Sequence, residues 1–198
     1  MRMILASQSP RRKQLLGQLG FQHFEILVPQ ADETFEPSLT PQEIASSICR
    51  RKAEAAGALA DDPYALIIAA DTMVFLGGLR LGKPRDQVDA FTMLSALSGR
   101  THQVCTGVTL LRGERLETRV ETTSVTFRSL TEDEIWYYIR SGEPMDKAGA
   151  YGAQGKAALF ISRMEGDYFN VMGLPLYLLG QMLADFGVPL FSNEEELY

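Results

Sequence analysis

The chain has 198 residues, of which 45% are hydrophobic and 22% charged, and 19 Lys and Arg against 25 Asp and Glu give a net charge of −6. This composition is that of an average soluble globular protein and excludes an intrinsically disordered chain. A net-negative surface also argues against a protein that coats nucleic acids or anionic membranes. A phosphate-bearing partner must therefore be bound by a local basic cluster.

The cysteines and the N-terminus indicate a cytoplasmic protein. Cys49 and Cys105 lie far apart and outside any CxxC pattern, so we expect free thiols in a reducing cytosol. The N-terminus turns polar at Ser7, too early for a secretory signal, and no window approaches the ~18 apolar residues of a membrane span. We expect neither nucleic acid nor a membrane as a partner.

The chain opens with a predicted strand, a polar turn and a helix. The apolar run 3–6 predicts the strand, and Ser9 followed by Pro10 is typical of a helix N-cap and the first helical residue. Residues 24–28 predict a second strand, and an acidic loop that contains Glu33 follows it.

A longer helix and a buried strand come next. Thr40 and Glu43 form a capping box, which predicts a helix of at most about two dozen residues. The uniformly apolar run 65–70 predicts a strand buried on both faces. We expect Asp71 and Thr72 at or near the end of this strand.

The second half of the chain mixes helices with hairpin strands. It predicts a hairpin turn at 77–78, a helix from Asp86, an antiparallel hairpin over 101–127, a capped helix from Thr131 to Gly142, a glycine-rich polar segment over 143–156, a strand over 159–161 and a final helix over 174–186. Parallel-type and hairpin-type strands together predict an α/β fold with a mixed sheet. We expect one domain, residues 1–198, with two lobes around a cleft.

Three cations, Arg11, Arg12 and Lys13, follow Ser9 at the start of the first predicted helix. Free N–H groups and the helix dipole favour anions there, so cations cost helix stability. A phosphate site explains their placement, and a solvated basic turn is the alternative. The GxxxxGKS/T pattern of a P-loop is missing.

Asp71 is a carboxylate beside a strand that the sequence predicts to be buried. Such a group is costly to bury unless it is paired, binds a metal or is catalytic, and a turn or helix cap is the alternative. Lys52, Lys83 and Glu33, each taken alone, are ordinary surface residues.

The segment 143–155 combines small residues with Gln154. Small residues let the backbone approach a ligand, and a glutamine amide offers a donor and an acceptor side by side. A flexible loop is the competing interpretation. His23 and His102 have no partner at metal-ligand spacing, so neither a zinc site nor a histidine-based nucleophile is supported.

Six segments follow one another along the chain: ASQSPRR (6–12), ADTMV (70–74), GKP (82–84), GRTHQV (99–104), EPMDKAGAYG (143–152) and EGDYFNVMGLP (165–175). In this order they resemble the signature of the Maf family, over about residues 4–176. The resemblance implies a two-lobed mixed α/β fold similar to that of the inosine triphosphatase (Ham1) group. It also implies a nucleoside triphosphate pyrophosphatase that uses a divalent cation, Mg²⁺ or Mn²⁺.

The resemblance assigns roles to individual residues. Asp71 corresponds to the general base, a metal ligand or both, Lys52 and Lys83 to active-site lysines, and Glu33 to a metal ligand. Carboxylates suit Mg²⁺ or Mn²⁺, and Arg11, with Ser7 in the same turn, would face the triphosphate.

Base preference in the family depends on the positions of Arg12, Thr72 and Gln154, and their identities resemble the branch that acts on dTTP and UTP. Gln154 alone cannot reject cytosine, because its amide can flip, so Arg12 is the expected second, fixed donor. Ala153 departs from the larger aliphatic residue expected there, which loosens the pocket without removing a functional group.

Other functions remain open at this point. A sibling branch of the family acts on 7-methyl-GTP with different residues at such positions. A nucleotide-binding regulator of septum formation is a second alternative, although it would not need the base Asp71. A sugar-nucleotide transferase ranks last, because no clear Asp-x-Asp motif is present. The physiological substrate among dTTP, UTP and modified pyrimidine triphosphates stays open, and a homodimer is only the family expectation.

Overall fold

The computed structural model describes residues 1–36 and 38–190, and within them seven strands form one sheet. The strands are β1 (Met3–Leu5), β2 (Glu25–Ile26), β3 (Leu66–Leu76), β4 (Leu79–Leu81), β5 (Thr101–Arg112), β6 (Arg115–Phe127) and β7 (Ile161–Glu165). Their order is β2-β1-β3-β5-β6-β7, and β4 pairs with β3 outside this path. β1 runs parallel to β2 and β3, whereas the other pairs are antiparallel. The predicted mixed α/β fold is confirmed.

Within the described residues there are six helices: all five that were predicted, four of which begin at the predicted caps, and one that was not predicted. They are α1 (Pro10–Gln18), α2 (Pro41–Leu59), α3 (Gln87–Leu97), α4 (Glu132–Arg140), α5 (Tyr168–Met172) and α6 (Leu176–Asp185), with 3-10 turns at Glu143–Asp146, Ala148–Ala150 and Lys156–Phe160. The side chains of Ser9, Thr40, Asp86 and Thr131 each accept a backbone N–H of the first helical turn. Across the described ranges, no helix combines the length and apolarity that a bilayer span requires.

Predicted strands differ in extent from the structure, and one helix was missed: the strand predicted over 24–28 covers only Glu25–Ile26. β3 does not end near Ala70 but continues to Leu76, because its second half pairs with both β4 and β5. The last strand begins at Ile161, since residues 156–160 form a 3-10 turn. The short helix α5, capped by the Asp167 side chain, was missed.

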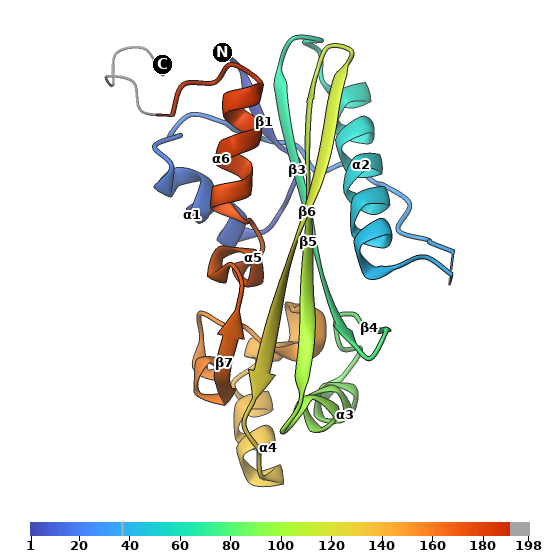
Figure 1. Cartoon of the computed structure of the whole chain (residues 1–198), viewed down its shortest axis with the longest axis vertical. Helices are drawn as coiled ribbons and strands as arrows, with labels where there is room; N and C mark the ends of the chain where they lie inside the picture. The colour runs from blue at the N-terminus through green and yellow to red at the C-terminus, as the bar shows by residue number, and fades with distance from the viewer. Residues whose placement is uncertain (37, 191–198) are drawn as a thin grey trace.

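The long strands β3, β5 and β6 run along most of the length of the molecule in Figure 1. At one end, α2 packs against one face of the sheet and α1 and α6 against the other; α3 and α4 cover the other end. Side chains of β3 alternate between these layers. Leu66, Ile68 and Ala70 join the core under α1 and α6, whereas Ile67 and Ala69 join the core under α2 together with the free thiol Cys49.

Candidate functional site

The edge of β3 is open in the middle of the strand. β1 pairs with β3 only as far as Ile68, and β4 pairs with it only from Val74 onward. A pocket of about 1020 Å³ lies at this gap, a volume in the usual range for small-ligand sites. It is lined by residues 6–12, 28–31, 70–74, 146–148 and 171–173 and by single residues of other elements, among them Glu33, Lys52, Lys83 and Gln154.

Asp71 lies in this gap, and its charge is balanced by Lys52 of α2. The Lys52 Nζ donates to the Asp71 Oδ1 at 2.5 Å and lies 2.8 Å from Glu33 Oε1. The side chains of Asp71 and Lys52 are 13% and 18% exposed, against 50% for Glu33. Burial alone would lower the pKa of Lys52, but the neighbouring carboxylates of Asp71 and Glu33 raise it.

Glu33 lies in the acidic loop that follows β2. The hydrogen bond from Lys52 lowers the pKa of Glu33, and the charges of Arg80 and Lys83 act in the same direction. The Arg80 guanidinium lies 3.7 Å from the Glu33 carboxylate. Glu33 is therefore held as an anion beside Asp71, although the two residues are far apart in the sequence.

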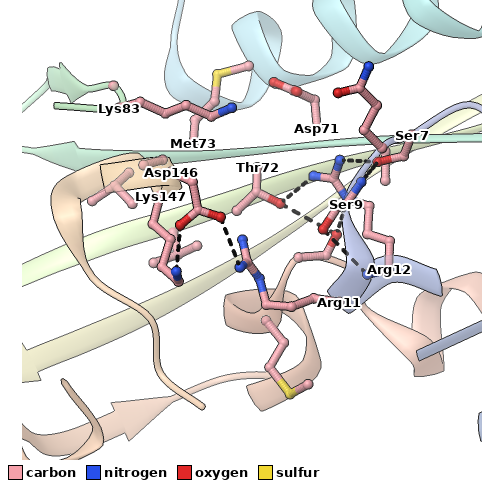
Figure 2. Close-up of a pocket in the computed structure, with 18 of the residues that line it drawn as sticks. Ser7, Ser9, Arg11, Arg12, Asp71, Thr72, Met73, Lys83, Asp146 and Lys147 are labelled. Carbon is pink, nitrogen blue, oxygen red and sulfur yellow. Dashed lines mark hydrogen bonds and ion pairs between the residues drawn. The ribbon is translucent and has the colours of Figure 1, made fainter. Parts of the chain in front are cut away.

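Thr72 follows Asp71 in the chain but belongs to the opposite face of the strand, where Arg12 is anchored. Arg12 donates from Nε to the Gly173 carbonyl (2.7 Å), from Nη1 to Ser7 Oγ (3.0 Å) and from Nη2 to Thr72 Oγ1 (3.0 Å). Burial lowers the pKa of Arg12, and the charge of Asp71 opposes this shift. Figure 2 shows the guanidinium turned toward Ser7 and Thr72.

Arg11 takes a different direction and faces the segment after α4. Its Nη1 lies 3.9 Å from Asp146 Oδ2, and Asp146 also accepts from Lys147 Nζ at 2.6 Å (Figure 2). Lys83 extends into the pocket from the side opposite Arg12 in the same view. Sequence reasoning gave no role to Asp146 or Lys147, because only the folded chain brings them to the basic turn.

Gln154 is an exposed residue of the pocket wall, and the segment that carries it is fixed from behind. Tyr138 accepts the backbone N–H of Gly152 at 3.1 Å and donates to Glu143 Oε1 at 3.0 Å. The other Glu143 oxygen accepts the N–H of Lys156 at 3.2 Å. The glycine-rich segment is thus a braced loop, and the alternative of a flexible loop is not favoured.

Of the three carboxylates that line the pocket, Glu33 and Asp71 share Lys52 as a partner and are the pair that could hold a divalent cation. Within residues 1–36 and 38–190, no group of three or more potential metal ligands of the His, Cys, Asp and Glu types is found. Mg²⁺ is usually held by one or two carboxylates together with water and substrate phosphates, so this pair fits such an ion. His102 is buried against Tyr151, outside the pocket lining, as expected of a structural histidine.

Comparisons with known proteins place this geometry in context. A family model described as Maf-like protein matches residues 2–186. A dTTP/UTP pyrophosphatase of Symbiobacterium thermophilum is 47% identical over 191 residues, which is 96% of this chain and 97% of that protein. A dTTP/UTP pyrophosphatase of Carboxydothermus hydrogenoformans is 49% identical over 189 residues, which is 94% of this chain and 100% of that protein.

A solved structure shares the fold at low sequence identity. A HAM1 protein from Coxiella burnetii superimposes with a TM-score of 0.50 at 17% identity, and the match covers 93% of this chain and 99% of that one. This likeness agrees with the expected relation to the inosine triphosphatase (Ham1) fold.

Proposed function

This chain belongs to the Maf family, and from that premise we propose that it is a nucleoside triphosphate pyrophosphatase that converts dTTP and UTP to the monophosphate and pyrophosphate. The observation that carries the proposal is the Lys52–Asp71 pair on the open edge of β3. It combines a base for water with a cation for phosphate in one pocket. The names of the curated relatives support the same reaction and the same substrates.

The proposed reaction is an in-line displacement on the α-phosphorus. The water oxygen bonds to phosphorus, the bond from phosphorus to the bridging oxygen breaks, and pyrophosphate leaves with that oxygen. Asp71 takes the proton of the attacking water. Catalysis of this kind depends mainly on positioning and charge neutralisation, which Lys52, Lys83 and Arg11 would supply to the phosphates.

Glu33 and Asp71 are the proposed ligands of a divalent cation, Mg²⁺ or Mn²⁺. When bound, such an ion supplies neutralisation of phosphate oxygens. The pairing of both carboxylates with Lys52 keeps their oxygens together at the pocket. Asp71 would thus serve as base, metal ligand or both.

The nucleobase of the substrate would be recognised by Gln154 together with Arg12 and Thr72. Ser7 accepts a hydrogen bond from the Arg12 guanidinium and holds it in place. Since Asp71 and Thr72 face opposite sides of β3, phosphate chemistry and base recognition would be divided between the two faces. We also propose that residues 1–198 act as one domain with two lobes, and that the protein works in the cytoplasm. The strands that connect both ends of the molecule support the single domain. Residues 191–198 lie outside the described ranges. From its membership in the family we expect the protein to form a homodimer.

A panel assay of the purified protein tests this proposal. Each canonical NTP and dNTP and 7-methyl-GTP is incubated with Mg²⁺ or Mn²⁺, and monophosphate, diphosphate, orthophosphate and pyrophosphate are separated. We expect monophosphate and pyrophosphate from dTTP and UTP. Preference for 7-methyl-GTP would keep the reaction but contradict the base assignment, and no turnover would favour the nucleotide-binding regulator.

A further inference from the structure

A chain of hydrogen bonds leads from Arg12 through Thr72 into the core. Arg12 Nη2 donates to Thr72 Oγ1, which lies 3.0 Å from Thr106 Oγ1. Thr106 Oγ1 in turn donates to the backbone carbonyl of Asn170 at 3.0 Å. Thr106 stands directly opposite Thr72 in the β3–β5 ladder. Thr106 and Asn170 are fully buried and do not line the pocket.

The donors and acceptors fix the direction in which each hydrogen bond of this series is donated. A guanidinium can only donate, so the Thr72 oxygen accepts from Arg12 and must send its single proton elsewhere. Thr106 Oγ1, at 3.0 Å, is nearer than the Gly173 carbonyl, at 3.5 Å, which already accepts from Arg12 Nε. The proton of Thr106 in turn has the Asn170 carbonyl as its acceptor. Every proton of the chain therefore points away from Arg12.

The end of the chain is fixed by the sheet. The Asn170 Nδ2 donates to the Val104 carbonyl and to Thr123 Oγ1, both at 2.9 Å. Thr123 Oγ1 donates to the Asp167 carbonyl, just before α5. Because Asn170 is tied to both β5 and β6, its carbonyl cannot easily move away from Thr106.

We propose that Thr106 and Asn170 are positioning residues that keep the Thr72 hydroxyl an acceptor toward the pocket and so select pyrimidines that carry an N3–H. The inference rests on the proposed function and adds the group that separates uracil and thymine from cytosine. Uracil and thymine donate from N3, whereas cytosine N3 accepts and would face a lone pair. The Gln154 amide can flip to suit either base, but the proton of Thr72 is held in place.

The test compares kcat/KM for UTP and CTP in the wild-type protein and three variants. In Thr106→Val the Thr72 proton loses its nearest acceptor and can turn toward the pocket, so the UTP-to-CTP ratio should fall about tenfold. Thr106→Ser restores the hydroxyl and should restore the ratio. Thr109→Val is the matched control, because it removes an equally buried β5 hydroxyl whose bond is to Thr118.

A double variant separates the effect of this hydrogen-bond relay (Arg12, Thr72, Thr106 and Asn170) from a general effect on packing. On a Thr72→Val background, Thr106→Val should change the ratio no further. Binding of UMP and CMP, measured by calorimetry, should shift in the same direction as the kinetic ratio. An unchanged ratio in Thr106→Val, or equal losses for UTP and CTP, would overturn the relay while UTP hydrolysis still upholds the proposed function. A wild-type protein that cleaves no pyrimidine triphosphate would overturn both.

Discussion

Asp71 and Thr72 are chain neighbours that do different work, because successive side chains of a strand point to opposite faces. Asp71 meets Lys52 of α2 on one face, and Thr72 meets Arg12 on the other. Both are accessible to one pocket only because the edge of β3 lacks a partner strand between Ile68 and Val74. A ligand that crosses this edge can contact both residues.

Asp71→Asn tests the base directly. The amide keeps the size of the side chain but cannot take a proton from water, so kcat for UTP should fall by about 10²–10⁴-fold. Lys52 loses one of its two carboxylate partners, keeps Glu33 and remains a cation for phosphate. Binding of a non-hydrolysable UTP analogue, measured by calorimetry, should persist. Full turnover in this variant would exclude Asp71 as the base, and Asp62→Asn, outside this pocket, controls for the loss of a carboxylate.

Gln154 and Lys83 line the same pocket, but their alanine variants should lose activity toward different sets of nucleotides. Gln154→Ala removes a base contact, so kcat/KM should fall selectively for uridine and thymidine triphosphates. Lys83→Ala removes a phosphate contact and should lower kcat/KM for all triphosphates alike. The measurement is the same nucleotide panel for both variants. An equal loss across all bases in Gln154→Ala would contradict its role in base recognition.

At the scale of elements, the starts of helices were predictable because an N-cap depends only on residues within one helical turn of each other. The Thr40–Glu43 and Thr131–Glu134 capping boxes are formed as expected. The position of Asp71 was not predictable, since an apolar run followed by a charge is typical of a strand end. Here the charge is tolerated in mid-strand because α2, the helix that precedes β3 in the chain, packs on the sheet and provides Lys52. The sequence did not predict that Arg11 pairs with Asp146 or that Arg12 binds Thr72, because folding alone brings these distant segments together.

Close packing of α2 on β5 depends on Gly107, which stands opposite Asp71 in the ladder. A Cβ at Gly107 would lie 2.5 Å from the Ala45 carbonyl oxygen, so α2 would have to move. Gly107→Ala should therefore destabilise the fold by about 1–3 kcal/mol and lower kcat, because α2 carries Lys52.

Urea unfolding and steady-state kinetics measure both effects of Gly107→Ala. Gly17→Ala in α1 is the matched control, since a Cβ there meets no atom within 4 Å and alanine favours a helix by about 0.5–1 kcal/mol. If Gly107→Ala keeps both stability and turnover, close packing at this glycine does not position Lys52.

At the scale of the whole molecule, the continuous strands β3, β5 and β6 connect the two ends, and each end has its own core. The core of the α3–α4 end includes an aromatic cluster around His102. His102 Nε2 lies 2.7 Å from the Tyr151 hydroxyl, and its ring packs edge-on against Phe127 and Tyr151. Tyr151 precedes Gly152 and lines the pocket, so this cluster links the core to the loop of Gln154.

Burial lowers the pKa of His102 from 6.5 to about 4, which makes the stability of the fold depend on pH. Between these values the unfolded chain binds a proton that the folded protein excludes. Stability should therefore fall as pH decreases from about 6.5 to about 4, by up to about 3 kcal/mol for this group, and the contribution should level off below that. Urea unfolding at several pH values measures this slope.

His102→Gln should flatten that dependence, because the amide can still hydrogen-bond Tyr151 but does not titrate over this range. The variant loses ring packing, so its stability is expected to be lower at neutral pH, and the comparison concerns the slope only. His23→Gln is the control that removes the chain's other imidazole, at an exposed position. A wild-type slope in His102→Gln would mean that carboxylates, and not this buried imidazole, govern stability in mild acid.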